Sequence, residues 1–191
     1  RFGRGAAGDV ETRQRLGAAH GFEVRAVGPV ARDGDAVSST RIRTALRAGD
    51  VAGAARLLGR VHDVDGTVVE GDRRGRTIGF PTANLACPPV LLAAAGVYAV
   101  VGRVAGASER LRGVANLGVR PTFEAGRSVE AHFFDFDGDL YGAALRLGFV
   151  ARLRGERKFD GLAALEAQID ADALAARAAL DDAAREAGAW I

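Results

Sequence analysis

The most informative part of this chain is Gly71–Leu85, which reads GDRRGRTIGFPTANL. Its regularly spaced glycines let the backbone approach a ligand closely and adopt positive φ angles. Its arginines add positive charge, and the clustered N–H groups of such a loop favour anions. We therefore interpret Gly71, Gly75, Arg76 and Gly79 as residues of a phosphate-binding cover.

Two polar residues, Thr82 and Asn84, follow that loop and stand two positions apart. In an extended segment, residues at this spacing point to the same face. Neutral oxygens are ligands that Mg²⁺ accepts, and magnesium keeps several waters when it binds nucleotide phosphates. We therefore expect Thr82 and Asn84 to share a Mg²⁺ ion, directly or through water, beside bound phosphates. The loop is not a Walker A sequence, because it lacks Gly-Lys-Ser/Thr.

The composition is that of an ordinary globular protein and limits the possible functions. Of the 191 residues, 48% are hydrophobic and 26% are charged, which is enough apolar content for a core. The net charge of +2 does not indicate a dedicated nucleic-acid binder. Cys87 is the single cysteine, which excludes an internal disulfide. Because no signal peptide or membrane-spanning apolar run is evident, we expect a cytoplasmic location.

The first sixty residues predict the end of an α/β unit. A helical pattern covers residues 10–19, a β-rich run covers 22–27, and a polar loop covers 31–36. A parallel strand is normally buried by neighbouring strands and helices, so this segment needs a partner. The chain also starts at Arg1 and contains no methionine. We therefore expect it to be the C-terminal fragment of a longer protein.

A run of hydroxyls, Ser38, Ser39 and Thr40, precedes a helical pattern. Such a helix N-terminus, with arginines at 41 and 43, suits a phosphate group. The alternative is that these residues only cap the helix, and the local sequence alone favours that alternative. Asp50 and Gly59 then predict the start and the end of a second helix over residues 51–58.

From about residue 61 the pattern changes to short runs of alternating residues. We predict strands at 64–70, 96–104, 111–117 and 128–136. The pair Asp137-Gly138 predicts a hairpin turn into a further strand that ends near residue 150. Several strands without long helices between them favour an antiparallel barrel. Beyond residue 152 we predict two helices that pack on the barrel, one capped by Asp160 and an alanine-rich one over 171–187.

Glu130 is the candidate general base. Phosphoryl transfer requires a group that orients or deprotonates the attacking hydroxyl. On its strand, Glu130 shares a face with His132, Phe134 and Phe136, so a carboxylate lies beside aromatic surface that can pack on a planar substrate. Such a carboxylate can accept the proton of an alcohol. The spacing alone fits a solvated strand face at least as well.

The N-terminal segment carries motifs of a known family. These are Arg1-Phe2-Gly3-Arg4-Gly5, Gly8-Asp9 and Ser38-Ser39-Thr40-Arg41-Ile42-Arg43. They resemble the closing half of the adenylyltransferase domain of bacterial bifunctional FAD synthetases. That family's adenylyl transfer depends on a His-x-Gly-His motif, which this sequence lacks. The resemblance implies that residues 1–60 are an incomplete α/β nucleotidyltransferase remnant, and that FMN is converted to FAD only if the missing N-terminal part is present.

A larger set of motifs follows between residues 61 and 180. In chain order these are Gly79-Phe80-Pro81-Thr82-Ala83-Asn84-Leu85, Gly96-Val97-Tyr98, Asn116-Leu117-Gly118, Val129-Glu130-Ala131-His132, Asp139-Leu140-Tyr141-Gly142, and Arg154 to Phe159 with Gln168-Ile169. Together they resemble the riboflavin kinase domain of the same bifunctional enzymes. The resemblance implies that residues 61–191 form an antiparallel Greek-key barrel with C-terminal helices.

The same resemblance implies a reaction and its residues. The domain moves the γ-phosphate of ATP to the ribityl 5′-hydroxyl of riboflavin, which yields FMN. In this family the residues that match Thr82 and Asn84 serve Mg-ATP, and the one that matches Glu130 is the catalytic base. The resemblance also implies that riboflavin and ATP are the substrates and that the protein has no membrane partner.

Two other functions stay open at this level. The first alternative is a small basic β-barrel that binds single-stranded nucleic acid through arginine-rich loops and exposed aromatic residues. Against it, aromatic residues make up only 6% of this chain. The other alternative is a flavin-binding module without turnover, which would bind riboflavin but form no ADP.

Overall fold

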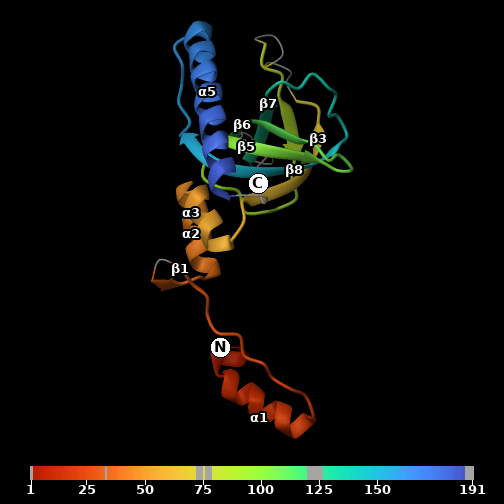
Figure 1. Ribbon diagram of the computed structural model, residues 1–191, viewed down its shortest axis with the longest axis vertical. Coiled ribbons are helices and arrows are strands. Elements are labelled where there is room, and N and C mark those ends of the chain that lie inside the picture. The colour runs from red at the N-terminus through yellow and green to blue at the C-terminus, as the bar shows by residue number, and fades with distance from the viewer. Residues whose placement is uncertain (1, 33, 72–74, 76–78, 120–126, 188–191) are drawn as a thin grey trace. The chain divides into compact units, whose positions relative to one another are not determined.

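The computed structural model describes residues 2–32, 34–71, 75, 79–119 and 127–187 (Figure 1). The chain divides into two compact units, Arg1–Val37 and Ser38–Ile191, which we describe separately. Within the described ranges, no helix is both long enough and apolar enough to cross a membrane. The predicted role of Arg76 lies outside the described residues.

The first unit contains one turn of 3-10 helix, one α-helix and a short ladder. Its elements are η1 (Arg4–Ala6), α1 (Val10–His20), β1 (Ala31–Arg32) and β2 (Asp35–Ala36). The carboxylate of Asp9 accepts a hydrogen bond from the Thr12 amide at 2.9 Å, and Gly21 ends α1 with a φ of 72°. The helix predicted over residues 10–19 is therefore confirmed.

The strand predicted over residues 22–27 is wrong. All six residues are described, and they form no strand. β-branched residues favour a strand only where a partner and a packed face are available, and Val27 is 92% exposed. The predicted polar loop 31–36 instead contains the antiparallel pair β1 and β2, which turns at Gly34 with a φ of 83°.

The second unit is built on a closed antiparallel barrel of six strands. They are β3 (His62–Val69), β4 (Ala83–Ala86), β5 (Gly96–Val104), β6 (Arg110–Val119), β7 (Arg127–Phe133) and β8 (Ala144–Arg154). Their order around the barrel is β3-β4-β7-β6-β5-β8. Strands β5, β6 and β7 form a meander, and β8 returns to pair with β5, which is a Greek key. The predicted barrel is confirmed.

Alternation along the strands fills the barrel and leaves an outer face for function. On β7, Val129, Ala131 and Phe133 are buried inside, while Glu130 and His132 point outward and are half-buried. Tyr98, Leu117 and Phe149 are among the fully buried side chains of the same core. Because the period is two, the pattern of each strand decides which side chains reach the outer face.

Two short helices precede the barrel in the same compact unit. They are α2 (Ser39–Ala48) and α3 (Val51–Leu58), and α3 packs against β3 and β8. The Asp50 carboxylate accepts a hydrogen bond from the Gly53 amide at 2.7 Å, and Gly59 ends α3 with a φ of 70°, as the sequence predicts. The sequence predicts a domain boundary after residue 60, between an adenylyltransferase remnant and a riboflavin kinase domain. That boundary stays a prediction.

The C-terminal region is a single helix, so the prediction of two helices is wrong. Helix α5 (Leu162–Ala187) runs unbroken along the outer face of β5, β6 and β8 (Figure 1). No glycine or proline interrupts residues 162–187. The amide of Leu165 donates to the carbonyl of Gly161 at 3.2 Å, so the helix starts from Gly161 rather than from Asp160.

The hairpin predicted at Asp137-Gly138 is also wrong. Strand β7 pairs with β4 and β6, whereas β8 pairs with β3 and β5, so the two strands are not neighbours. The chain leaves the sheet after Phe133 and turns at Asp135, which has a φ of 56°. The Asp135 carboxylate accepts hydrogen bonds from Arg177 of α5 at 2.9 and 3.1 Å. A tertiary ion pair that no local sequence pattern reveals is therefore present at this turn.

Candidate functional site

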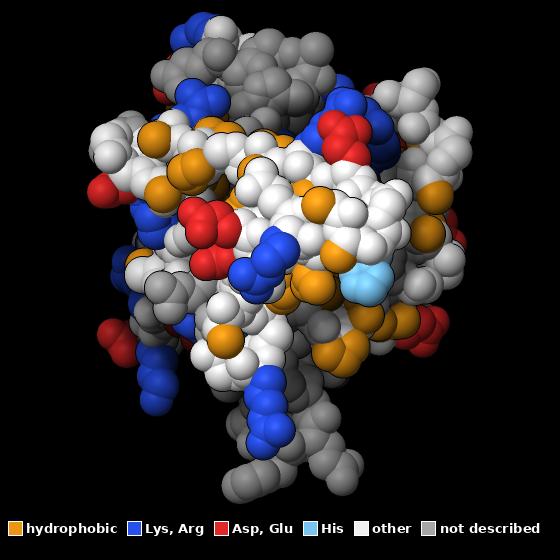
Figure 2. Space-filling view, turned by 90° about the horizontal axis from the view of Figure 1, so that it is seen from below, with side chains coloured by type: hydrophobic (Ala, Val, Ile, Leu, Met, Phe, Trp, Pro, Cys, Tyr) orange, Lys and Arg blue, Asp and Glu red, His pale blue; other side chains and the backbone are white. Residues whose placement is uncertain are grey.

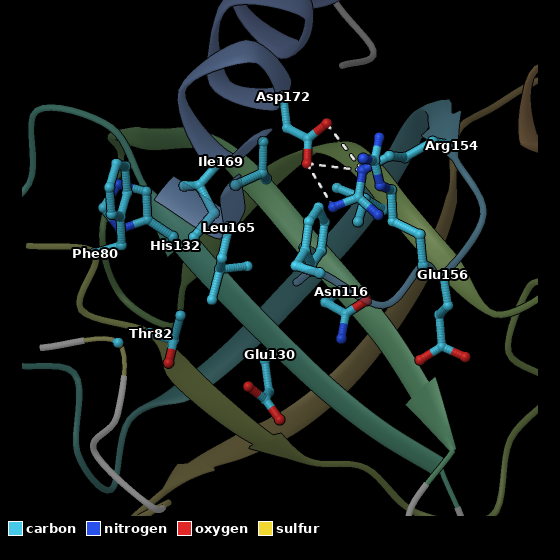
Figure 3. Close-up of a pocket in the computed structure, with 16 residues that line it drawn as sticks. Phe80, Thr82, Asn116, Glu130, His132, Arg154, Glu156, Leu165, Ile169 and Asp172 are labelled. Carbon is cyan, nitrogen blue, oxygen red and sulfur yellow. Dashed lines mark hydrogen bonds and ion pairs between the residues drawn. The ribbon is translucent and has the colours of Figure 1, made fainter. Parts of the chain in front are cut away.

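A cavity of about 310 Å³ lies on the outer face of β5, β6 and β7, next to the first half of α5. Figure 3 shows Leu165, Ile169 and Asp172 projecting from one side of the helix over these strands. Spacings of four and three residues place these three on one helical face. Phe80 and Thr82 line the cavity from the segment before β4. We call it the first cavity.

A row of outward-facing residues crosses the strands at the base of the first cavity. Asn84 is the Cα partner of Glu130, and Glu130 is the Cα partner of Asn116 on the next strand. The row continues through Val97 of β5 to Arg154 of β8. Every member after Asn84 lines the first cavity. The predicted base Glu130 thus stands between two amide side chains, and it forms no ion pair with another described residue.

An ion-pair network closes the opposite end of the first cavity. Arg154 donates to the carboxylate of Asp172 from Nε at 3.0 Å and from Nη2 at 2.8 Å. Gln168 also donates to Asp172 at 2.8 Å and accepts from Arg157 at 2.7 Å. Asp172 is only 6% exposed, so its charge is compensated by partners rather than by water. Both guanidinium groups also face the ring of Phe159, at 5.6 and 4.8 Å from its centre.

A second cavity, of about 520 Å³, lies on the other side of Thr82. It is lined by the segment from Pro81 to Ala83, by inner residues of β7, and by the connection that carries Phe136, Asp139 and Tyr141. Among the described residues, Thr82 alone lines both cavities. Thr82 therefore lies where the two cavities meet.

The glycines predicted to cover phosphate lie close to these residues. Gly71 packs so tightly on the Asn84 side chain that a methyl group there would overlap the amide. Gly75 lines the first cavity, and its carbonyl accepts a hydrogen bond from the Phe80 amide at 2.9 Å. Gly79 has a φ of 78°, which suits glycine. Asn84 is 8% exposed beneath Gly71 and lines neither cavity.

The hydroxyls of Ser38, Ser39 and Thr40 lie elsewhere. Ser38 is the N-cap of α2, and its Oγ accepts a hydrogen bond from the Arg41 amide at 3.2 Å, as the capping alternative expects. None of the three lines either cavity. A phosphate-binding role for them stays a prediction.

Magnesium fits the donor chemistry of Thr82, which lines both cavities, and of its neighbours Asn84 and Glu130. The described residues include no cluster of three or more His, Cys, Asp or Glu side chains that would form a protein-only metal site. The hydroxyl of Thr82, the amide oxygen of Asn84 and the carboxylate of Glu130 are hard oxygen donors, and Mg²⁺ is commonly held by few protein oxygens plus phosphates and water. The residues present therefore fit a nucleotide-bound magnesium ion.

The prediction from sequence missed the role of several residues that line the first cavity. Arg154, Phe159 and Ile169 were noted only as parts of a family motif, and Asp172 was not noted at all. The available signal was the helical spacing of Leu165, Ile169 and Asp172. That spacing indicates one face, but it does not reveal which strand the face covers.

The comparisons with known proteins agree with this geometry. The family model described as "Flavokinase: Riboflavin kinase" matches residues 58–180. The bifunctional riboflavin kinase/FMN adenylyltransferase of Bacillus subtilis (strain 168) is 46% identical over 141 residues, which cover 71% of this chain and 44% of that protein. The protein of the same description from Escherichia coli (strain K12) is 41% identical over 179 residues, which cover 93% of this chain and 56% of that protein.

A solved structure gives a further likeness. It is a Streptococcus pneumoniae protein described as a macrolide-efflux protein, 35% identical, with a TM-score of 0.75 over 93% of this chain and 55% of that chain. This chain spans about half the length of the curated relatives it matches. Because the family model matches well over half of the 191 residues, the chain belongs to the riboflavin kinase family.

Proposed function

We propose that this chain transfers the γ-phosphate of ATP to the 5′-hydroxyl of riboflavin and releases ADP and FMN. The observation that carries the proposal is the position of Thr82 between two cavities, with Glu130 on the wall of one of them. A phosphotransferase must hold a donor and an acceptor on either side of the transferred group. The family membership supports the same reaction.

The first cavity suits the acceptor. Leu165, Ile169 and Phe159 give apolar and aromatic surface for a planar ring system, and Arg154 is fixed beside it by Asp172. Glu130 and Asn116 offer oxygens to the hydroxyls of a sugar-like chain. In this arrangement the ring lies toward α5 and the terminal hydroxyl lies toward Glu130 and Thr82.

The second cavity and the glycine-rich loop suit the nucleotide. Thr82 and Asn84 would hold a magnesium ion, which neutralises negative charge on the phosphates when it is bound. Gly71, Gly75 and Gly79 allow the backbone near these side chains to approach phosphate oxygens. Arg76 is the proposed charged contact of that loop.

Glu130 supplies the proton acceptor. The 5′-oxygen of riboflavin forms a bond to the γ-phosphorus while the bond from that phosphorus to the bridging oxygen of ADP breaks. The hydroxyl proton passes to the Glu130 carboxylate. The products are then ADP and the phosphate monoester FMN, so atoms and charge balance.

The activity of the longer relatives is a separate proposal. We propose that residues 1–60 are the C-terminal remnant of an adenylyltransferase domain, whose phosphate site would include Ser38, Ser39 and Thr40. Since the chain spans about half of those relatives and lacks a His-x-Gly-His motif, conversion of FMN to FAD would need the remaining part of such a protein. The proposed location is the cytoplasm.

The test measures ADP and FMN formation from Mg-ATP and riboflavin. We expect wild-type turnover, and a fall in kcat of about 10²- to 10⁴-fold in Glu130→Gln with riboflavin binding retained. Glu109→Gln, an exposed residue that lines neither cavity, is the matched control and should keep full activity. Full turnover in Glu130→Gln would contradict the mechanism, and riboflavin binding without ADP would indicate a flavin-binding module.

The same preparation tests the nucleic-acid alternative. Figure 2 shows basic and acidic side chains interspersed on the face in view, rather than a patch of one sign. Because the net charge of the whole sequence is also only +2, we expect no strong, salt-dependent binding of single-stranded oligonucleotides. A steep fall in oligonucleotide affinity with salt would favour that alternative.

A further inference from the structure

His132 lies at the junction of the two cavities and has no part in the proposed chemistry. It stands two residues after Glu130 on β7, so both side chains point to the same outer face. Its Nδ1 lies 2.8 Å from the carbonyl oxygen of Pro81, 51 residues away in sequence. Because a carbonyl oxygen can only accept, Nδ1 carries the hydrogen and donates it.

This hydrogen bond replaces a missing rung of the sheet. Strands β4 and β7 pair through Ala83 with Ala131 and Asn84 with Glu130. One step further, Thr82 would stand opposite His132, but β4 begins only at Ala83. Pro81 has no N–H, so the backbone on that side of Thr82 cannot contribute a donor to the ladder. The imidazole holds the segment against β7 where the ladder ends.

Aromatic contacts fix the imidazole in the orientation that this bond requires. The ring of Phe80 meets the imidazole edge-on, with 5.4 Å between the two ring centroids. The ring of Phe134 also meets the imidazole edge-on, with 6.0 Å between their centroids. Phe80 is in turn held by its amide hydrogen bond to Gly75. The hydrogen bond and the ring contacts of His132 therefore join the Phe80–Pro81–Thr82 segment to β7 where the ladder has ended.

We propose that His132 is a positioning residue that places the Thr82 hydroxyl beside Glu130 through its hydrogen bond to the Pro81 carbonyl. This inference rests on the proposed kinase function. Its consequence is specific, because Thr82 belongs to the nucleotide and metal side of the site. Loss of the bond should weaken Mg-ATP binding. Riboflavin binding should change little in a variant that keeps an aromatic ring at position 132, because the ring preserves the surface that His132 gives to the first cavity.

The first test compares wild type with His132→Phe, which keeps an aromatic ring and removes the donor. We expect kcat/KM for Mg-ATP to fall about three- to tenfold, the range that loss of one hydrogen bond gives. The dissociation constant for riboflavin, measured without nucleotide from flavin fluorescence, should stay within about twofold. Unchanged kcat/KM for Mg-ATP, or an equal loss of riboflavin affinity, would overturn the proposal.

A pair of further variants tests the same hydrogen bond if His132→Phe does not fold. His132→Asn and His132→Leu are similar in size, but only asparagine offers an N–H to the Pro81 carbonyl. We expect the asparagine variant to retain a clearly higher kcat/KM for Mg-ATP than the leucine variant. Equal values in the two would show that the donor has no role.

His62 provides a matched control within the same barrel. Its Nε2 also binds a backbone carbonyl, that of Leu91 at 3.2 Å, and its ring stacks on Phe149, but it lines neither cavity. His62→Phe should lower the melting temperature and leave the KM for Mg-ATP unchanged. A rise in that KM equal to the rise in His132→Phe would mean that both effects are structural, which overturns the proposal.

Equilibrium binding separates this inference from the proposed function. Calorimetric titration of wild type and the His132 variants with Mg-ATP needs no turnover. A wild type that binds both ligands but forms no FMN contradicts the kinase proposal, and the binding comparison still decides the role of His132. Weaker Mg-ATP binding in the phenylalanine and leucine variants than in wild type and the asparagine variant supports it, and equal binding in all variants rejects it.

Discussion

Asn84 of β4 and Glu130 of β7 are Cα partners across two paired strands. Directly paired residues of antiparallel strands have their side chains on the same face, about 5 Å apart at Cβ. The side chain expected to serve the nucleotide and the expected base are thus neighbours, although 46 positions separate them in sequence. The pairing of β4 with β7 therefore assembles the proposed reaction centre.

The first prediction concerns Asn84→Ala, which removes one oxygen donor from the proposed magnesium site. Half-saturation with Mg²⁺ should require a higher concentration, and kcat/KM for Mg-ATP should fall about tenfold or more, because a hydrogen bond or ligand to a charged group contributes about 1.5–3 kcal/mol. Riboflavin binding should not change. Magnesium titration of FMN formation measures this, and an unaltered magnesium requirement would exclude Asn84 as a ligand.

The second prediction uses the close packing of Gly71 on Asn84. Gly71→Ala would place a methyl group on the Asn84 amide, which is buried and cannot move freely. Activity should therefore fall to about the level of Asn84→Ala. In the double variant Gly71→Ala/Asn84→Ala the two effects should not add, since both act through one side chain. Independent, multiplying losses would show that Gly71 acts on something other than Asn84.

Local sequence predicted those parts of the fold whose causes are local. The bounds of β5 were predicted as Gly96–Val104, because the run is rich in β-branched residues and begins at a glycine. Helix α3 was predicted over residues 51–58, between Asp50 and Gly59. Its two caps lie directly next to the helix in the sequence, so a local pattern reveals them. The fold class followed from the number of such strands and from the family resemblance.

The remaining features depend on contacts between distant residues. At the turn after β7, Asp135 accepts hydrogen bonds from Arg177 of α5, and within α5 the charge of Asp172 is compensated by Arg154 of β8. Neither partner is within 17 positions, so no window of sequence reveals it. The candidate base and metal ligands were named from motifs, but the wall of the first cavity was not, since it forms only where α5 meets the barrel.

The third prediction tests that wall through Asp172→Asn. The change leaves Arg154 partly buried without its charged partner, and breaking such a pair costs about 3 kcal/mol. We expect lower stability in urea and weaker riboflavin binding, because Arg154 and Phe159 lose their fixed positions beside the cavity. Denaturation midpoints and flavin fluorescence measure the two effects.

The control for Asp172 is Asp181→Asn on the same helix. Asp181 accepts a hydrogen bond from Arg112 at 2.6 Å, but both side chains are about half exposed to solvent. Exposed pairs contribute about 1 kcal/mol or less. The control variant should therefore keep nearly normal stability and normal riboflavin affinity. Equal destabilisation by the two substitutions would contradict the importance of burial.

The fourth prediction concerns pH and His62. Burial of its imidazole lowers the pKa of His62 below the ordinary value of 6.5, in spite of the Leu91 carbonyl, which favours the protonated form. The unfolded chain therefore binds more protons than the folded one as pH falls through 6.5. The free energy of unfolding should be highest above that pH and should decrease toward pH 5.

His62→Phe isolates this contribution. Asp65 and Asp135 have pKa values lowered by hydrogen bonds from Arg146 and Arg177, so their stabilising effect is lost only as pH falls below about 4. Between pH 7.5 and pH 5 the variant should therefore lose less stability than the wild type, whatever its absolute stability. Urea denaturation at both pH values measures the difference, and an identical loss in both proteins would show that His62 is protonated equally well in the folded and unfolded chain.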